Sequence, residues 1–213
     1  MKQKIQGVLF DFGGVLTLPQ NKDLFDAMVR YARISHEGFA RSYAAHRFEF
    51  DRGVVDRHAY WRRVYEENQV SFNRKASDNL TLLDIKSWTA PNEPVIEWAS
   101  RLRDQGVRTG VVSNMPADYV ADIRRTSPWL DDFEPLVFSG LERQNKPEKA
   151  IFLTAISRLA LPKSDILFID DTPENVSGAE RAGLPSVHYT GVVELAQLIA
   201  ELYDLPPVQN EAA

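Results

Sequence analysis

Carboxylates that end two apolar runs are the residues of this sequence best suited to chemistry. Asp11 ends one run and is followed by Gly13 and Gly14, whose permissive backbone lets a ligand approach closely. Asp170 and Asp171 end a second run, where two adjacent negative charges repel each other unless a cation, a shared proton or solvent relieves them. A hard divalent ion with oxygen ligands does this, and Mg²⁺ is the default. The sequence therefore predicts a Mg²⁺ site formed by these carboxylates.

Polar residues also follow two other segments of the chain. Ser113 and Asn114 end an apolar run and offer hydroxyl and amide donors, although either could simply cap the following helix. Lys146 precedes Pro147 and an amphipathic segment, a fixed position from which an ammonium group could neutralise phosphate and compensate the acidic cluster. Each of these signals is weak alone.

The elements that must position these residues alternate between strand and helix. Helical spacing of apolar residues predicts helices near residues 93–105, 148–159 and 174–182. Short apolar runs without alternation are typical of buried parallel strands; they occupy residues 7–11, 108–113, 136–139, 165–170 and 186–189. This order indicates an α/β fold with a Rossmann-like, three-layer core and a parallel sheet, in which ligands bind beyond the carboxyl ends of the strands.

One connection is too long for a simple crossover. About 100 residues separate Asp11 from Ser113, whereas a strand–helix–strand unit needs only about 30. Residues 18–88 contain several amphipathic segments with turn-like breaks, so we expect an inserted helical bundle that acts as a cap. The core is then residues 1–17 and 89–205, and the aperiodic residues 206–213 are expected to form a flexible tail.

Composition narrows the classes of function. The chain has 213 residues, 44% of them hydrophobic, and a formal charge of −5, so no general basic field exists to attract nucleic acid. The absence of Cys excludes catalysis by a thiolate and metal sites with Cys ligands. The four His residues do not have the spacing of metal ligands. No run of about 18 apolar residues and no signal-peptide core is present. We expect a cytoplasmic protein without membrane or nucleic-acid partners, either a monomer or a homodimer.

Four motifs in order resemble those of the haloacid dehalogenase-like hydrolases that carry a helical cap after the first strand. They are residues 8–16 (VLFDFGGVL), 111–114 (VVSN), 146–147 (KP) and 168–175 (FIDDTPEN). The first and fourth are the specific ones. The resemblance implies a sheet with strand order 5-4-1-2-3 and a reaction through a covalent intermediate on an aspartate.

The resemblance also implies roles for individual residues. Asp11 would attack phosphorus as the nucleophile, with Lys146 as the second catalytic residue. Mg²⁺ would be held by Asp11, the carbonyl oxygen of Gly13 and Asp171, with Asp170 close by through water or as an orienting group. The phosphoryl oxygens would be bound by Ser113, Asn114 and Lys146.

Gly13 departs from the family pattern. Phosphatases of the family usually carry a second aspartate there, which protonates the leaving group, and general acid–base assistance is worth about 10²–10⁴-fold. We therefore expect a Mg²⁺-dependent phosphatase for a small phosphorylated metabolite with a good leaving group, such as an anomeric sugar phosphate or an acyl phosphate. The sequence leaves open a carbon–halogen hydrolase, a phosphonatase using a cap lysine (Lys22, Lys75 or Lys86), or a phosphate-binding regulatory protein.

Cap residues near the turn at 51–53 complete the candidates. Arg47, Arg52, His58 and Tyr60 would reach the site if this turn faces it, although surface positions are the more common environment for such residues.

Overall fold

A parallel five-stranded sheet forms the centre of the molecule. The computed structural model describes residues 2–209. The strands are β2 (Gly7–Phe10), β3 (Arg108–Ser113), β4 (Leu136–Phe138), β5 (Ile166–Asp170) and β6 (Ser186–His188). Their spatial order is β4-β3-β2-β5-β6 with parallel pairing throughout. When the five strands of this sheet are numbered 1 to 5 along the chain, starting at β2, the order from the β6 edge is 5-4-1-2-3. The predicted fold and strand order are confirmed.

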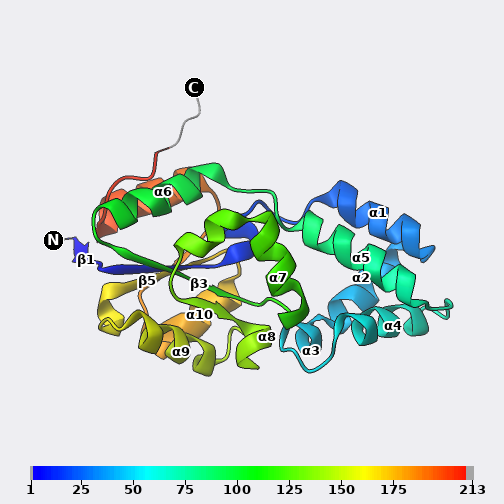
Figure 1. Cartoon of the computed structure of the whole chain (residues 1–213). Helices are drawn as coiled ribbons and strands as arrows, with labels where there is room; N and C mark the ends of the chain where they lie inside the picture. The colour runs from blue at the N-terminus through cyan, green and yellow to red at the C-terminus, as the bar shows by residue number, and fades with distance from the viewer. Residues whose placement is uncertain (1, 210–213) are drawn as a thin grey trace.

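The sheet is covered on both faces, which explains why its strands lack alternation. Val8 and Phe10 point into a cluster that includes Trp98 of α6 (Glu93–Asp104), whereas Leu9 points into a second cluster with Phe152 of α9 (Lys149–Leu159). Helix α11 (Val192–Leu202) lies on the face of α6, and α10 (Pro173–Ala182) lies on the face of α9 (Figure 1). The result is the expected three-layer core.

The remaining core elements are short or lie at the sheet margins. They are α7 (Ala117–Thr126), α8 (Ser139–Glu142), η2 (Pro128–Asp132), η3 (Lys163–Asp165) and the turn η1 (Phe12–Leu16). A second, two-stranded sheet pairs β1 (Gln3–Lys4) with β7 (Tyr203–Asp204) in parallel. Such two-residue strands give no periodic signal, and the sequence did not predict them.

The first residues of the expected flexible tail pack against the core. Trp98 Nε1 donates a hydrogen bond of 2.9 Å to Pro206 O, and Val208 is buried. The prediction of a loose tail is therefore wrong at these positions, because Val208 finds apolar surface to cover. Residues 210–213 lie outside the described part of the chain.

Five helices lie between β2 and α6 and form a lobe beside the sheet (Figure 1). They are α1 (Lys22–Ala32), α2 (His36–Ala45), α3 (Arg47–Asp51), α4 (Arg57–Glu67) and α5 (Arg74–Ser87). Four of them begin at a capping side chain that accepts a backbone N–H, namely Asn21, Ser35, Asp56 and Asn73. The short α3 was not expected. We call this lobe the cap.

Aromatic side chains fill the interior of the cap. The rings of Phe50 and Tyr60 stack at 4.4 Å, and Tyr60 also meets Trp61 edge to face at 4.8 Å. All three side chains are fully buried. They stabilise the bundle as its core, as their helical spacing indicates.

Two antiparallel segments connect the cap to the core. Thr17 pairs with Pro91, Leu18 N donates to Ala90 O, and Asn92 N donates to Leu16 O. These contacts fall in the segments where the sequence places the boundaries between cap and core. None of the helices in residues 2–209 is long and apolar enough to cross a membrane.

Candidate active site

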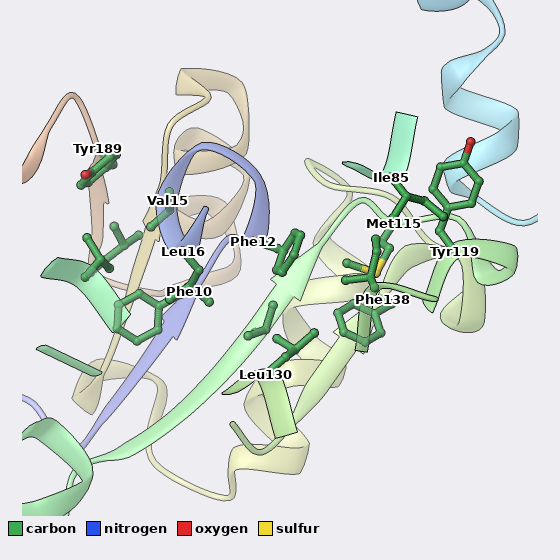
Figure 2. Close-up of a cluster of buried hydrophobic side chains, with 14 of the residues drawn as sticks. Phe10, Phe12, Val15, Leu16, Ile85, Met115, Tyr119, Leu130, Phe138 and Tyr189 are labelled. Carbon is green, nitrogen blue, oxygen red and sulfur yellow. The ribbon is translucent and has the colours of Figure 1, made fainter. Parts of the chain in front are cut away.

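A cavity of about 270 Å³ lies where the carboxyl ends of the strands meet the cap. From the core it is lined by Asp11, Ser113, Asn114, Lys146 and Asp171. Its other wall comes largely from the cap and from the helix that faces it, with Tyr43, Arg47, Asp51, Ile85, Trp88 and Tyr119. Figure 2 shows Ile85 of α5 beside Met115 and Tyr119 of the core, so cap and core share apolar contacts at this cavity.

Asp11 follows β2 and caps the turn η1. Its Oδ1 accepts a hydrogen bond of 2.6 Å from Phe12 N and lies 2.8 Å from Lys146 Nζ. Burial raises the pKa of Asp11 to about 7; Lys146 opposes this increase, whereas the nearby Asp170 and Asp171 add to it. A carboxylate in this position keeps one oxygen fixed by Lys146 and Phe12 while its side chain faces the cavity.

Lys146 is the cation that compensates this acidic cluster. Its side chain is 1% exposed, and Nζ lies 2.6 Å from Asp170 Oδ2 as well as close to Asp11. Burial alone favours the neutral amine, but Asp11 and Asp170 outweigh it and hold the pKa of Lys146 above its ordinary value. Lys146 is therefore a charged group at the floor of the cavity.

Asn114 holds the backbone of Lys146. Its Oδ1 accepts a 2.8 Å hydrogen bond from Lys146 N, and its Nδ2 donates to Lys146 O at 3.1 Å. Both polar ends of the amide are thus engaged by main chain. These bonds indicate that Asn114 positions Lys146, and its contact with phosphoryl oxygens stays a prediction. Ser113, buried at the end of β3, keeps its expected place in the cavity wall.

The two adjacent aspartates differ in environment. Asp170 is fully buried; Thr172 N donates to its Oδ1 at 2.8 Å, and Asn175 Nδ2 lies within 3.2 Å of both oxygens. Asp171 is exposed, and burial of part of its carboxyl together with Asp170 raises its pKa. With Lys146 also bound to it, Asp170 has protein donors on both oxygens, whereas Asp171 lines the cavity and keeps exposed surface.

The arrangement of carboxylates fits a hard cation. One oxygen from each of Asp11, Asp170 and Asp171 lies within 4.8 Å of the others. The Asp171 carboxylate lies against Gly14, where φ is 81° and a Cβ would overlap Asp171 Oδ2. Gly14 therefore leaves the space that brings Asp171 to Asp11. Carboxylate and carbonyl oxygens suit Mg²⁺, so Asp11, Asp171 and the carbonyl of Gly13 are a suitable donor set.

The cap contributes site residues that sequence reasoning missed or left open. Of the four candidates near residues 51–53, only Arg47 lines the cavity. Arg52 instead pairs with Glu148, His58 Nδ1 contacts Ser77 Oγ, and Tyr60 lies in the cap interior. Tyr43 and Asp51 line the cavity together with Arg47. Arg47 and Asp51 are four residues apart and share one face of α3, whereas Tyr43 belongs to α2, so no single helical pattern in the sequence joins the three.

Arg47 is surrounded by acceptors and aromatic rings. Its Nη1 donates a 2.8 Å bond to Asp84 Oδ2, and its guanidinium lies 5.4 Å from the Tyr43 ring centroid. Asp84 also accepts from Tyr43 at 2.7 Å and Tyr119 at 3.0 Å. Burial opposes the charge, but Asp51 and Asp84 hold the pKa of Arg47 above its ordinary value. The network fixes Arg47 in the cavity wall.

Comparison with known proteins bears on this geometry. The chain is 26% identical over 113 residues to a sesquiterpene phosphatase of Aspergillus oryzae, covering 51% of this chain and 58% of that protein. It is 29% identical over 135 residues to the phosphoglycolate phosphatase of Salmonella typhi, covering 63% of this chain and 53% of that protein. The match therefore spans little more than half the length of these curated relatives.

Solved structures agree in fold. A HAD family enzyme of Bacteroides thetaiotaomicron superposes with a TM-score of 0.73 at 14% identity, over 92% of this chain and 98% of that one. The same enzyme is known in a complex with magnesium and inorganic phosphate, with a TM-score of 0.66, 16% identity and coverage of 86% and 93%. The L-2-haloacid dehalogenase of Xanthobacter autotrophicus gives 0.65 at 17% identity, over 98% and 90%.

The family itself follows from the match across most of the sequence. The family model for haloacid dehalogenase-like hydrolases matches residues 5–183, which include Asp11, Ser113, Lys146 and the Asp170–Asp171 pair. The cavity, the acidic cluster and four of the five strands of the parallel sheet lie within the matched residues, and β6 follows directly after them. The chain therefore belongs to the haloacid dehalogenase-like hydrolases.

Proposed function

We propose that this protein is a Mg²⁺-dependent phosphatase that hydrolyses a small phosphorylated metabolite through an aspartyl-phosphate intermediate on Asp11. The observation that carries the proposal is the contact of Lys146 Nζ with Asp11 at 2.8 Å and with Asp170 at 2.6 Å, at the floor of the cavity. The cation opposes the rise that burial causes in the pKa of the Asp11 carboxyl, and it provides a positive field for phosphate.

The roles of the residues follow from their positions. Asp11 attacks phosphorus, and the bond from phosphorus to the leaving oxygen breaks. Lys146 neutralises phosphoryl charge, and Ser113 offers a hydroxyl donor from the end of β3. When bound by Asp11, Asp171 and the carbonyl of Gly13, Mg²⁺ supplies further charge neutralisation. Asn114 and Asn175 keep Lys146 and Asp170 in place.

The cavity supports a small substrate. Its volume of about 270 Å³ is near the lower end for ligand pockets. Ile85, Trp88, Met115 and Tyr119 provide apolar surface beside the charged floor, so the organic part of the ester meets a largely apolar wall. Two of the curated relatives are named phosphatases of phosphoglycolate and of a sesquiterpene, which fits a compact monoester of a metabolite.

The Asp170–Asp171 pair disfavours carbon–halogen hydrolysis, and the residues that line the cavity disfavour phosphonate cleavage. Attack on carbon with loss of halide needs no metal, so Asp170 and Asp171 side by side would be an electrostatic cost without use in a dehalogenase. A phosphonatase needs a lysine at the substrate, but within residues 2–209 Lys22, Lys75 and Lys86 of the cap do not line the cavity. A phosphate-binding protein without turnover is the third possibility.

A substrate panel tests the proposal. Phosphate release is measured from sugar phosphates, phosphoglycolate, acyl phosphates, terpenyl phosphates and para-nitrophenyl phosphate, with Mg²⁺ or EDTA, for wild type and Asp11→Asn. We expect turnover that requires Mg²⁺ and is lost in the variant. Halide release from 2-haloacids, or the absence of any turnover by folded protein with Mg²⁺, would contradict it.

A further inference from the structure

Because residue 13 is a glycine, the core lacks the carboxyl group that usually protonates the leaving group. In this structure the ring of Trp88 occupies the space of that side chain. The ring of Trp88 lies 3.2 Å from the place where a Cβ of residue 13 would be. Trp88 therefore fills the space into which a side chain at position 13 would grow. If the enzyme protonates its leaving group, the acid must come from another side of the cavity.

Asp51 is a carboxyl group on that other side. It ends α3, lines the cavity and is only 8% exposed. Its backbone oxygen accepts a 2.5 Å hydrogen bond from Ser139 Oγ of the core. The next residue, Arg52, donates to both carboxylate oxygens of Glu148 at 2.8 and 2.9 Å. Glu148 lies two residues after Lys146 in the sequence. Contacts on either side of its carboxyl thus hold Asp51 over the core site.

The Asp51 carboxyl has hydrogen-bonding capacity that the described protein groups do not satisfy. Its Oδ1 forms an ion pair with Arg47 Nε at 2.8 Å, but within the described structure no well-aligned N–H or O–H donates to this oxygen. Arg47 is shared with Asp84, which also binds two tyrosines. A buried carboxyl with an unsatisfied oxygen at the wall of a substrate cavity is a candidate for contact with substrate.

The surroundings of Asp51 allow both protonation states near neutral pH. Burial raises its pKa to about 7; Arg47 lowers it, Asp84 raises it and Lys146 lowers it. A general acid is most effective when its pKa lies near the working pH.

We propose that Asp51 of the cap is the general acid for this reaction and replaces the carboxyl that Gly13 lacks. The inference rests on the proposed phosphatase function. Asp11 forms a bond to phosphorus while the phosphorus–oxygen bond to the leaving group breaks, and the proton of Asp51 moves to the departing oxygen, which leaves as an alcohol. Water then attacks phosphorus, the bond from phosphorus to Asp11 breaks, and the ionised Asp51 takes the proton of the water. Phosphate, Asp11 carboxylate and protonated Asp51 result.

A leaving-group series tests this role with Asp51→Asn. Phosphate esters of alkyl alcohols should lose about 10²–10⁴-fold in kcat/KM, whereas kcat/KM for acyl and para-nitrophenyl phosphates should change by less than about tenfold, since their leaving groups need no proton. The base for the second step is also lost, so para-nitrophenyl phosphate should give a burst of about one equivalent of nitrophenol, followed by slow turnover.

Two controls separate a chemical role from a structural one. Glu49→Gln removes an exposed carboxylate from the same helix and should leave the kinetics unchanged. In wild type itself, kcat/KM for alkyl phosphates should fall above the pKa of Asp51 near 7, and that for acyl phosphates should not. An equal loss for all leaving groups without a burst, or a wild-type pH profile independent of the leaving group, would overturn the inference. Wild type that releases no phosphate in an Asp11-dependent way would instead overturn the proposed function.

Discussion

Lys146 and Asp170 form an ion pair of 2.6 Å in which the two side chains are 1% and 0% exposed. The same ammonium lies 2.8 Å from Asp11, so one buried cation stabilises two buried carboxylates. Removing one partner of a buried pair is far more costly than the net stabilisation the pair provides, because the remaining charge stays desolvated. Lys146 therefore links stability and chemistry in this protein.

Replacing Lys146 tests its contribution to the stability of the fold and its contribution to phosphatase activity. Lys146→Met should lower the free energy of unfolding by about 3–5 kcal/mol in urea denaturation without Mg²⁺, because Asp11 and Asp170 lose their cation. Adding Asp170→Asn should restore part of the stability but not phosphatase activity. A single variant as stable as wild type, or costs that simply add in the double variant, would show that the pair is not coupled as described.

A pair of glycine substitutions isolates the role of Gly14 at the metal site. Gly14 and Gly106 have φ of 81° and 80°, but only at Gly14 would a Cβ meet Asp171; at Gly106 nothing lies within 4 Å. Both Gly→Ala variants should be destabilised by about 1–2 kcal/mol from backbone strain. Thermal unfolding with and without Mg²⁺ should show stabilisation by the ion in wild type and Gly106→Ala, and a much reduced effect in Gly14→Ala. Equal stabilisation of the two variants would argue against Asp171 as a ligand.

The contact between Arg52 and Glu148 gives a prediction about the cap. The pair is bidentate and half-buried, with side chains 30% and 36% exposed, and Arg52 Nε also donates to Arg143 O at 3.0 Å. Arg52→Ala and Glu148→Ala should each raise KM more than they lower kcat, since the cap is held less firmly over the cavity. A double-mutant cycle on kcat/KM should give a coupling of about 1 kcal/mol that decreases in high salt. No coupling would mean that the pair does not contribute to cap closure.

The pKa of Asp51 predicts a pH dependence of stability. Its pKa rises from 3.8 to about 7 on folding, so the folded protein binds the proton more tightly than the unfolded chain. The free energy of unfolding contributed by this group is therefore largest at low pH and falls as pH rises from about 4 to 7, by up to about 4 kcal/mol.

Asp51→Asn removes this titration. The stability of the variant relative to wild type should increase as pH rises from 5 to 8, as measured by urea denaturation at each pH. Glu49 lies on the solvent side of the same helix. The free energy of unfolding of Glu49→Gln should therefore change with pH in parallel with that of wild type. A constant difference between Asp51→Asn and wild type would show that Asp51 ionises at its ordinary pKa.

The core was predictable because its signals are local and mutually consistent. The apolar run before Asp11 and the run that ends at Asp170 are buried on both faces, and that burial requires the uniform hydrophobicity seen in the sequence. A helix that begins at a proline and ends at a glycine, as α10 does at Pro173 and Gly183, has boundaries that a sequence can show. The strand order followed from the family resemblance rather than from the pattern.

The cap side of the site was not predictable to the same degree. The role of Asp51 depends on how α3 lies against α8, through Ser139 and Gly140, and no periodicity within α3 contains that information. The hydrogen bonds between the Asn114 amide and the backbone of Lys146, 32 residues away in sequence, were likewise not predicted. Such contacts depend on tertiary structure, which is why the residue types were found and their partners were not.

Trapping the phosphorylated enzyme tests the covalent route on Asp11 most directly. Wild type and Asp51→Asn are mixed with Mg²⁺ and an acyl or aryl phosphate, quenched in acid within the first turnover, digested and analysed by mass spectrometry. A phosphoryl group should be found on the peptide that contains Asp11, more abundant in Asp51→Asn, and absent from Asp11→Asn. Release of phosphate with no label on Asp11, or with the label on another residue, would contradict the aspartyl-phosphate mechanism.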